Sequence, residues 1–374
     1  MKKFWLLIQK AFQAETSARK WSIFTVSISA SIVIGAALIA FIVDPHYRYR
    51  KPFFYDTVYY EIYATAPHIL KNRQYDLLML GTSMTRNFFL EDINSAFNCK
   101  SIKLAASGGT VPDLCKFFEI ARKSKADKLK RVVLSLDIYP LNKVGSHYED
   151  FDYMYRDDHR EDYRYLFSRQ TYSSIMYLIK RKTRPKRHRA HQSDSNRMFA
   201  TEYAGKPYGL KAVLSDALQN ELTHHTQEPY NKEMHQKNFY GLLLPMFDNN
   251  PDIKFTVYLP PYHIYTYCQS EKFGETEGLI KQRTEVLLEL LKRKNVELHD
   301  FQSAPEYVEN HDYFSDVQHF SNVAARRLLG DLLSGRRKLT TTEDVAKNEQ
   351  ELRTLIRKNM LEYTCNMSNY KGRR

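Results

Sequence analysis

Two short segments, far apart in the chain, carry residue types that together could perform acyl chemistry. In the first, Ser83 follows Gly81 and Thr82 directly after an apolar run at residues 77–80. A run of this length suits a strand buried on both faces, and the glycine lets the chain turn sharply after it. Ser83 is therefore predicted at the carboxyl end of a strand, where a serine hydroxyl can be exposed to a ligand. The alternative is that Ser83 serves as the N-cap of the helix that follows.

The second segment places Asp316 three residues before His319. A polar turn with this spacing can bring the carboxylate to one imidazole nitrogen and leave the other nitrogen free for a serine. A serine hydroxyl becomes a good nucleophile only when a neighbouring base takes its proton, and that base must be held in orientation. Ser83, His319 and Asp316 supply these three roles by residue type, as a candidate catalytic triad. A loop histidine beside a capping aspartate is the alternative interpretation.

Acyl chemistry also needs hydrogen-bond donors directed at the oxyanion that forms in the transition state. The backbone N–H of Ser83 is one candidate. Gly108 or Gly109 supplies a second, because a Gly-Gly turn lets the backbone approach a ligand closely; a tight turn after the second strand is the alternative. Five further candidate oxyanion or substrate-binding residues stand near predicted strand ends: Asn87, Asp137, Asn142, Tyr262 and His263.

These five residues have different expected roles. Asn87 and Asn142 are candidates for a side-chain donor to the oxyanion. A charged Asp137 would repel an oxyanion, so it is expected to orient a partner or a substrate hydroxyl. Tyr262 and His263 follow the fourth predicted strand, and they either contact substrate or form a rigid loop that shapes the cleft.

With these segments the sequence resembles the SGNH (GDSL-like) hydrolase superfamily. It looks closest to the membrane-anchored branch that includes the alginate-acetylation and teichoic-acid D-alanine-transfer proteins. In this resemblance, which spans roughly residues 74–335, three blocks match: Gly81-Thr82-Ser83 (nucleophile), Ser107-Gly108-Gly109 (glycine) and Asp316-Val317-Gln318-His319 (acid–base). The sequence departs from the family pattern twice. Thr82 replaces the usual Asp of the first block, and Leu136-Asp137-Ile138-Tyr139 stands where a Gly-x-Asn-Asp block is expected, which leaves one oxyanion donor unassigned.

Five strand-like segments that could position these residues recur along the chain, and helical patterns separate most of them. In the pattern at residues 279–294, for example, Ile280, Leu287 and Leu291 fall on one helical face. Strands alternating with helices imply βαβ units and a parallel sheet. Right-handed crossovers then favour a flavodoxin-like three-layer α/β sandwich, the fold that the resemblance also implies. The predicted strands are residues 76–80, 101–105, 131–136, 254–259 and 296–299.

The N-terminal part of the chain predicts a membrane anchor. Residues 1–21 form a basic lead, and residues 22–43 carry no charge and are long enough to cross the hydrocarbon core as a helix. A cleaved signal peptide is the alternative. Five Lys or Arg precede the span and three follow it closely, so the positive-inside rule favours a cytoplasmic N-terminus. These features predict a single-pass protein of the bacterial inner membrane, with its catalytic domain facing the periplasm.

Three further regions complete the predicted organisation. Residues 44–73 form a juxtamembrane linker, whose aromatic part at residues 47–67 either lies near the lipid headgroups or packs on the domain. Within the domain at residues 74–335, an insertion over about residues 141–237 is expected to form a cleft wall or lid. Its residues 180–189 carry seven Lys or Arg, either as a solvated loop or as a contact for anionic lipid or acidic glycan. Residues 336–374 form a polar helical tail that partly docks on the domain or on a partner.

Composition narrows the function classes. A net charge of +13 favours a negatively charged neighbour such as a membrane surface or an acidic glycan. Nucleic acid is set aside, because no recognised binding motif accompanies the predicted membrane span. The four widely spaced cysteines and the scattered histidines show no metal-ligand spacing, so no metal or other cofactor is expected.

The predicted function is a membrane-anchored, SGNH-like serine esterase or O-acyltransferase. Its expected substrate is an acylated cell-envelope glycan, and a membrane acyltransferase is a candidate partner. Ester cleavage and acyl transfer share an acyl-enzyme, so the residues do not separate them. The alternative is a non-catalytic protein of the same fold, which serves as a scaffold or glycan-binding partner of a membrane acyltransferase or an export machine.

Overall fold

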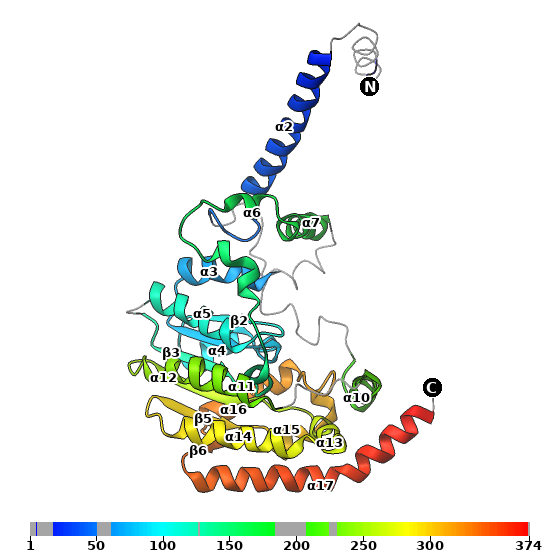
Figure 1. The fold of residues 1–374 in the computed structure, drawn as a ribbon. Helices are drawn as coiled ribbons and strands as arrows, with labels where there is room; N and C mark the ends of the chain where they lie inside the picture. The colour runs from blue at the N-terminus through cyan, green and yellow to red at the C-terminus, as the bar shows by residue number, and fades with distance from the viewer. Residues whose placement is uncertain are drawn as a thin grey trace.

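A six-stranded sheet lies at the centre of the domain, with its strands in the order β2-β1-β3-β4-β5-β6 (Figure 1). The structure, a computed structural model of the chain, describes Trp5 and residues 18–50, 61–125, 128–183, 207–223 and 230–372. Every strand pairing is parallel except that of β5 with β6. The expected α/β architecture with a parallel sheet is therefore confirmed. The strands are β1 (Leu77–Gly81), β2 (Ser101–Ala105), β3 (Arg131–Ser135), β4 (Lys254–Leu259), β5 (Val296–Asp300) and the unpredicted β6 (Lys338–Leu339).

The central strands form because short apolar runs bury both of their faces. Along β1, Leu78 and Leu80 belong to one hydrophobic cluster, whereas Leu77 and Met79 belong to a second one. Successive side chains of a strand point to opposite faces of the sheet, so the two clusters lie on opposite sides of it. Helices complete both clusters, which gives the molecule helix, sheet and helix layers.

Helices from distant parts of the chain cover the two faces. The cluster around Leu78 draws on α3 (Ile62–Asn72), α5 (Val111–Ser124) and α14 (Thr276–Leu291). The cluster around Leu77 draws on α4 (Leu90–Phe97), α13 (Ile264–Lys272), α16 (Asn322–Leu333) and α17 (Thr342–Gly372). Shorter helices follow β1 and β5: η1 (Ser83–Thr85), α15 (Pro305–Val308) and η5 (His311–Tyr313).

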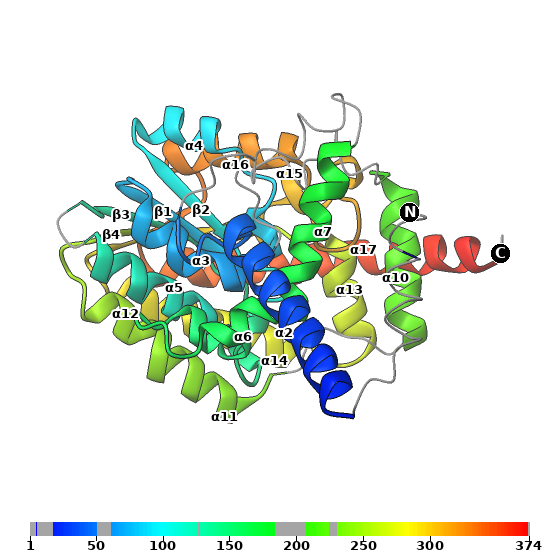
Figure 2. The same cartoon turned by 90° about the horizontal axis from the view of Figure 1, so that it is seen from above.

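The long connection between β3 and β4 contains the insertion predicted at about residues 141–237. Its described part is helical, and two of its helices, at residues 162–166 and 169–183, lie beside the N-terminal helix (Figure 2). The basic segment at residues 180–189 lies outside the described residues after Thr183. The helices are η2 (Tyr139–Asn142), η3 (Tyr148–Met154), α6 (Asp162–Leu166), α7 (Arg169–Thr183), α10 (Leu210–Thr223), α11 (Lys232–His235), the π-helix η4 (Gln236–Leu243) and α12 (Leu244–Asp248).

The N-terminal helix α2 (Ala18–Val43) projects away from the domain (Figure 1). Its 24 residues from Lys20 to Val43 are long and apolar enough to cross a membrane, and they are almost entirely exposed. The expected linker at residues 44–73 is more ordered than a tether, because it contains α3. Tyr47 is buried in the core, which favours packing on the domain over a position at the headgroups for that residue. Residues 51–60 of the linker lie outside the described part.

The polar tail docks on the domain as one long helix, α17. Four of the apolar residues at helical spacing are buried: Val345, Leu352, Leu355 and Ile356. They face α13 and α14, which α17 contacts. The amphipathic pattern in the tail therefore marks a face that packs within the chain.

Candidate active site

The first strand delivers Ser83 to the carboxyl edge of the sheet. Gly81 ends β1, and a Cβ on it would lie 2.7 Å from the Cβ of Ser135 on β3, so the glycine permits close strand packing rather than an unusual backbone angle. Thr82, not Ser83, is the N-cap of η1, because its hydroxyl accepts from the N–H of Met84. The Ser83 hydroxyl is thereby left for another partner, and it lies 2.7 Å from Nε2 of His319.

The turn that carries His319 is built around the carboxylate of Asp316. Oδ1 of Asp316 accepts the backbone N–H of Gln318 at 2.9 Å and that of His319 at 2.6 Å. Nδ1 of His319 lies 2.9 Å from Oδ2 of the same carboxylate. One aspartate therefore fixes both the backbone of the turn and the plane of the imidazole ring.

These contacts assign the protons along the chain of three side chains. A carboxylate can only accept, so Nδ1 of His319 carries a hydrogen and donates it to Asp316. In the neutral imidazole, Nε2 then has a lone pair that accepts the Ser83 hydroxyl proton. This is the arrangement in which a histidine acts as a general base towards serine.

The pKa of Asp316 keeps this arrangement in place at neutral pH. Burial by itself would raise the pKa of this carboxyl group. The hydrogen bond and charge of His319, together with the N–H groups of His319 and Gln318, outweigh burial and lower the pKa to about 2. Asp316 is therefore ionised over the physiological range, and it stabilises the imidazolium that forms when His319 takes a proton.

Two backbone N–H groups near this edge of the sheet are candidates for oxyanion donors. Residues Gly81 and Ala105 pair in the β1–β2 register, so the turns that follow the two strands lie side by side. Gly108 has a φ of +66°, which a glycine adopts without strain. The N–H of Gly109 donates to the carbonyl of Ala106 at 2.9 Å and is consumed by the turn. Within the described residues, the N–H groups of Ser83 and Gly108 donate to no backbone carbonyl.

Thr82 and Asp137, which stand where the resemblance led us to expect other residues, contact each other. Asp137 is buried, and its carboxyl group accepts from the hydroxyl of Thr82 and, at 2.5 Å, from that of Tyr262. Burial raises the pKa of Asp137 above its ordinary value, although both hydroxyl groups oppose this. Asp137 thus faces the residue before the serine, and it holds the first turn of η1 by way of Thr82.

The other candidate residues have different surroundings. Asn87 is buried and donates to the carbonyl of Phe320, so it holds the acid–base turn rather than facing a ligand. Asn142 exchanges hydrogen bonds with Gln282 in the buried part of the insertion. Neither asparagine makes a described hydrogen bond with the triad.

His263 is also buried, and it acts on the acid–base turn through its backbone. Its N–H donates to the carbonyl of Val317 at 3.0 Å, while its ring contacts His311 at 2.8 Å. Burial lowers the pKa of His263 well below its ordinary value, and the neighbouring His311 adds a smaller effect in the same direction. His263 therefore stays neutral, and its backbone holds the turn that carries His319.

Asp216 is a further carboxylate beside the triad, and sequence reasoning did not identify it. Oδ2 of Asp216, on α10, accepts the N–H of Val317 at 3.2 Å. Burial, and then the nearby charge of Asp316, raise the pKa of Asp216. Because Asp216 lies in the insertion with no motif around it, only the packing of α10 against the turn identifies it.

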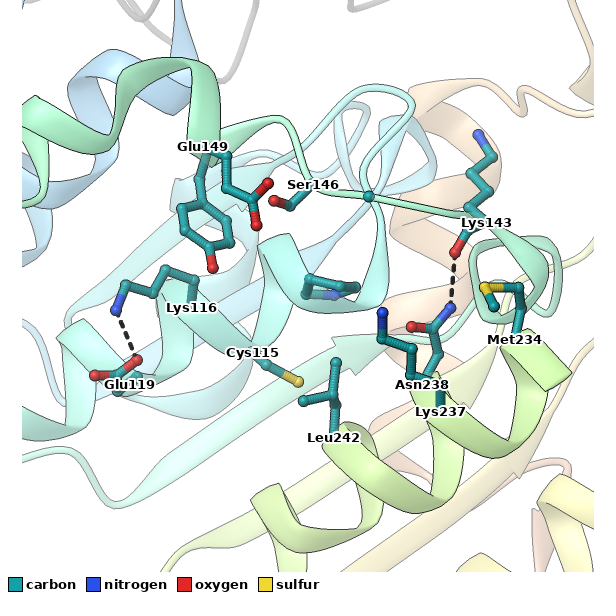
Figure 3. A pocket seen from close by; sticks show the side chains of 13 residues that line it. Cys115, Lys116, Glu119, Lys143, Ser146, Glu149, Met234, Lys237, Asn238 and Leu242 are labelled. Atoms are coloured by element: carbon teal, nitrogen blue, oxygen red, sulfur yellow. Dashed lines mark hydrogen bonds and ion pairs between the residues drawn. The ribbon is translucent and has the colours of Figure 1, made fainter.

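A cavity of about 350 Å³ opens between α5, the loop after η2 and the π-helix η4 (Figure 3). Lys143 lines it and donates to the carbonyl of Gly108 at 3.4 Å, so one edge of the cavity adjoins the glycine turn. None of the three triad residues lines it. Among the described residues no group of His, Cys, Asp or Glu could hold a metal ion, and all four cysteines are free thiols.

Comparison with known proteins gives no significant match: no family model, no curated protein and no solved structure corresponds to this chain.

Proposed function

We propose that the protein is a membrane-anchored serine esterase or O-acyltransferase that acts on ester-linked acyl groups of a cell-envelope glycan. One observation carries the proposal. Ser83, His319 and Asp316 come from segments 236 residues apart, yet they form one hydrogen-bonded chain with a serine–imidazole distance of 2.7 Å. Serine needs such a neighbouring, oriented base to become a nucleophile.

The architecture supports an SGNH-like fold for this chemistry. The parallel strands follow the order 2-1-3-4-5, which is the flavodoxin-like order, and ligands of such sheets bind beyond the carboxyl ends of the strands. The nucleophile turn follows β1 and the glycine turn follows β2, as in the resemblance. The pairing of Thr82 with Asp137 offers a reason why both departures from the family pattern occur together.

The geometry suggests the following steps. Ser83 Oγ attacks the ester carbonyl carbon while Nε2 of His319 takes the hydroxyl proton. The N–H groups of Ser83 and Gly108 donate to the oxyanion. The tetrahedral intermediate then collapses, the carbon–oxygen bond to the leaving alcohol breaks, and His319 returns the proton to that oxygen. Water or a second hydroxyl group then attacks the acyl-serine by the same route, which gives hydrolysis or transfer respectively.

The charge and the N-terminal helix support the proposed location and substrate. A net charge of +13 favours an acidic glycan or an anionic membrane surface, and α2 could anchor the domain outside the cytoplasm. A reporter that is active only in the periplasm, fused after residue 140, should be active. Activity of a cytoplasmic reporter at that position would place the domain on the other side.

The test of the proposal is covalent trapping of Ser83. A fluorophosphonate probe should label the purified full chain, and Ser83→Ala should abolish labelling. Ser334→Ala removes an exposed serine at the end of α16 and serves as the matched control, which should label normally. Hydrolysis of acetyl esters should follow the same pattern. If the wild-type chain is neither labelled nor active, the non-catalytic scaffold would account for the fold instead.

A further inference from the structure

Two helices of the insertion expose apolar side chains directly beside α2. Both α6 and α7 contact α2. Tyr163 is 62 % exposed, Phe167 47 %, Met176 49 % and Ile179 52 %. Large apolar side chains gathered on one part of a surface commonly mark an interaction site, and the candidate active site uses none of these four.

The exposed residues of α7 have the pattern of a helix that lies in a membrane interface. Met176 and Ile179 are three residues apart, so they share one side of the helix. Arg169, seven residues before Met176, is exposed on the same face, because seven residues complete about two turns. The opposite face buries Thr171, Ser174 and Ile175 against the domain. Apolar side chains with flanking cations are typical of interfacial helices.

The position of α6 is fixed relative to the end of α2 by a group of buried polar residues, the juxtamembrane knot of Asp44, Arg48, Asp162 and Tyr165. The Tyr165 hydroxyl donates to Asp44 at 2.8 Å, and Arg48 forms an ion pair with Asp162 at 2.8 Å. Asp44 directly follows the last residue of α2. The knot therefore holds α6 at the level where α2 ends.

The arrangement in space agrees with an interfacial position. Figure 1 shows α7 nearly end-on just below the domain end of α2, and Figure 2, turned by 90°, shows it along its length. The helix α7 thus lies across the direction of α2. A helix of 24 residues is about 36 Å long, longer than a hydrocarbon core of about 30 Å. The domain end of α2 can therefore reach the headgroup region, and α6 and α7 with it.

We propose that α6 and α7 form a membrane-proximal platform that rests on the surface of the bilayer crossed by α2. Phe167, Met176 and Ile179 enter the headgroup region, and Arg169 meets anionic headgroups. We expect this surface to contact lipid rather than a protein. The knot holds α6 beside the membrane-spanning helix α2, and the net charge of +13 favours anionic lipid. The platform does not depend on the proposed chemistry of Ser83.

The test measures whether single side chains contact lipid. The fluorophore nitrobenzoxadiazole is attached to Met176→Cys or Ile179→Cys in the full chain, which is reconstituted into vesicles of phosphatidylethanolamine and phosphatidylglycerol. The background carries Cys365→Ser, because Cys365 is exposed, and the background chain without an added cysteine gives the signal of the remaining thiols. We expect blue-shifted emission at both sites, and strong quenching by lipids with a spin label near the headgroup.

Two control positions make the outcome decisive. Leu361 is 75 % exposed and belongs to α17, a helix that lies far from α2 (Figure 1), so a fluorophore on Leu361→Cys should stay unquenched. Ile32→Cys inside α2 should be quenched by deeper spin labels. Quenching at 176 and 179 no greater than at 361 would overturn the platform and leave this face to a protein partner. Failure to quench at 32 would overturn it as well, because the span would then be absent.

Discussion

The candidate active site and the juxtamembrane knot both enclose an aspartate among several hydrogen-bond donors, yet their side chains differ in exposure to solvent. In the knot, Asp44 accepts three backbone N–H groups, of Arg48, Tyr49 and Arg50, and the hydroxyl of Tyr165. In the site, Asp316 accepts two backbone N–H groups and the ring of His319. The side chain of His319 is 35 % exposed, whereas that of Arg48 is 3 % exposed.

The two aspartates also differ in the direction of their pKa shifts. Burial is the largest effect on the pKa of Asp44 and raises it, although the hydrogen bonds from Tyr165 and from three backbone N–H groups oppose this. His319 can carry a charge and lowers the pKa of Asp316 to about 2 against the effect of burial. A dense hydrogen-bond network therefore does not by itself indicate chemistry. The proposed function rests instead on an ionised acid, a partly exposed base and backbone donors left available.

The largest expected effect is a loss of ester turnover in variants of the candidate active site but not in variants of the knot. Ser83→Ala or His319→Ala should lower ester turnover on the order of 10⁶-fold, because either change removes the nucleophile–base unit. Thermal unfolding should change little, since Ser83 and His319 are both partly exposed. Arg48→Ala in the knot should leave kcat nearly unchanged. Equal loss of activity in Arg48→Ala and Ser83→Ala would contradict the distinction.

Asp316→Asn should cost less activity than loss of the serine or histidine, on the order of 10⁴-fold. The amide disfavours the required tautomer of His319 and withdraws the negative charge from the imidazolium. Steady-state kinetics on an acetyl ester check this, with Asp312→Asn as the matched control on the neighbouring η5. A loss of less than about tenfold would remove Asp316 from the proposed unit.

The knot should show its effect in stability instead. Arg48→Ala removes the arginine partner of Asp162, in a site where the two side chains are 3 % and 13 % exposed, and leaves His159 as the other ion-pair partner of this carboxylate. Breaking a buried ion pair costs about 3 kcal/mol. Urea unfolding of the detergent-solubilised chain should detect this change. Arg326→Ala, which breaks an exposed pair with Asp92, should change the free energy of unfolding by less than about 1 kcal/mol.

The smallest expected effect is a pair of opposite pH trends. The folded pKa of Asp316 lies below its unfolded value, so its contribution of about 2 kcal/mol is present above pH 4 and is lost as pH falls towards 2. The pKa of Asp44 is raised, so its contribution is present at low pH and is lost as pH rises through that pKa. Unfolding free energies of Asp316→Asn and Asp44→Asn, each compared with wild type across pH, should therefore diverge in opposite directions. Parallel trends would contradict the assignment.

Much of the fold follows from local patterns in the sequence. Residues 101–105 and 254–259 form strands with the predicted bounds. The strands predicted at 131–136 and 296–299 differ by one residue at one end, and the strand predicted at 76–80 is shifted by one residue at both ends. These runs are apolar enough for burial to dominate the choice of structure. The strand β6 was not predicted, because a strand of two residues is too short to show an alternation of apolar and polar residues. The linker prediction missed α3, whose apolar residues are separated by polar ones in an aromatic segment.

The sequence by itself determined five of the six strands and the local pairing of Asp316 with His319, because these two residues are three positions apart and one turn brings them together. Only the tertiary structure decided which serine that turn meets. Ser83 and His319 are 236 residues apart, and contacts between distant segments bring them to one edge of the sheet. The tertiary structure also decided that Gly108 rather than Gly109 retains an available N–H, that Thr82 binds Asp137, and that Asp216 holds Val317. Each of these contacts joins segments that are far apart in the chain, and no local sequence pattern predicts such contacts.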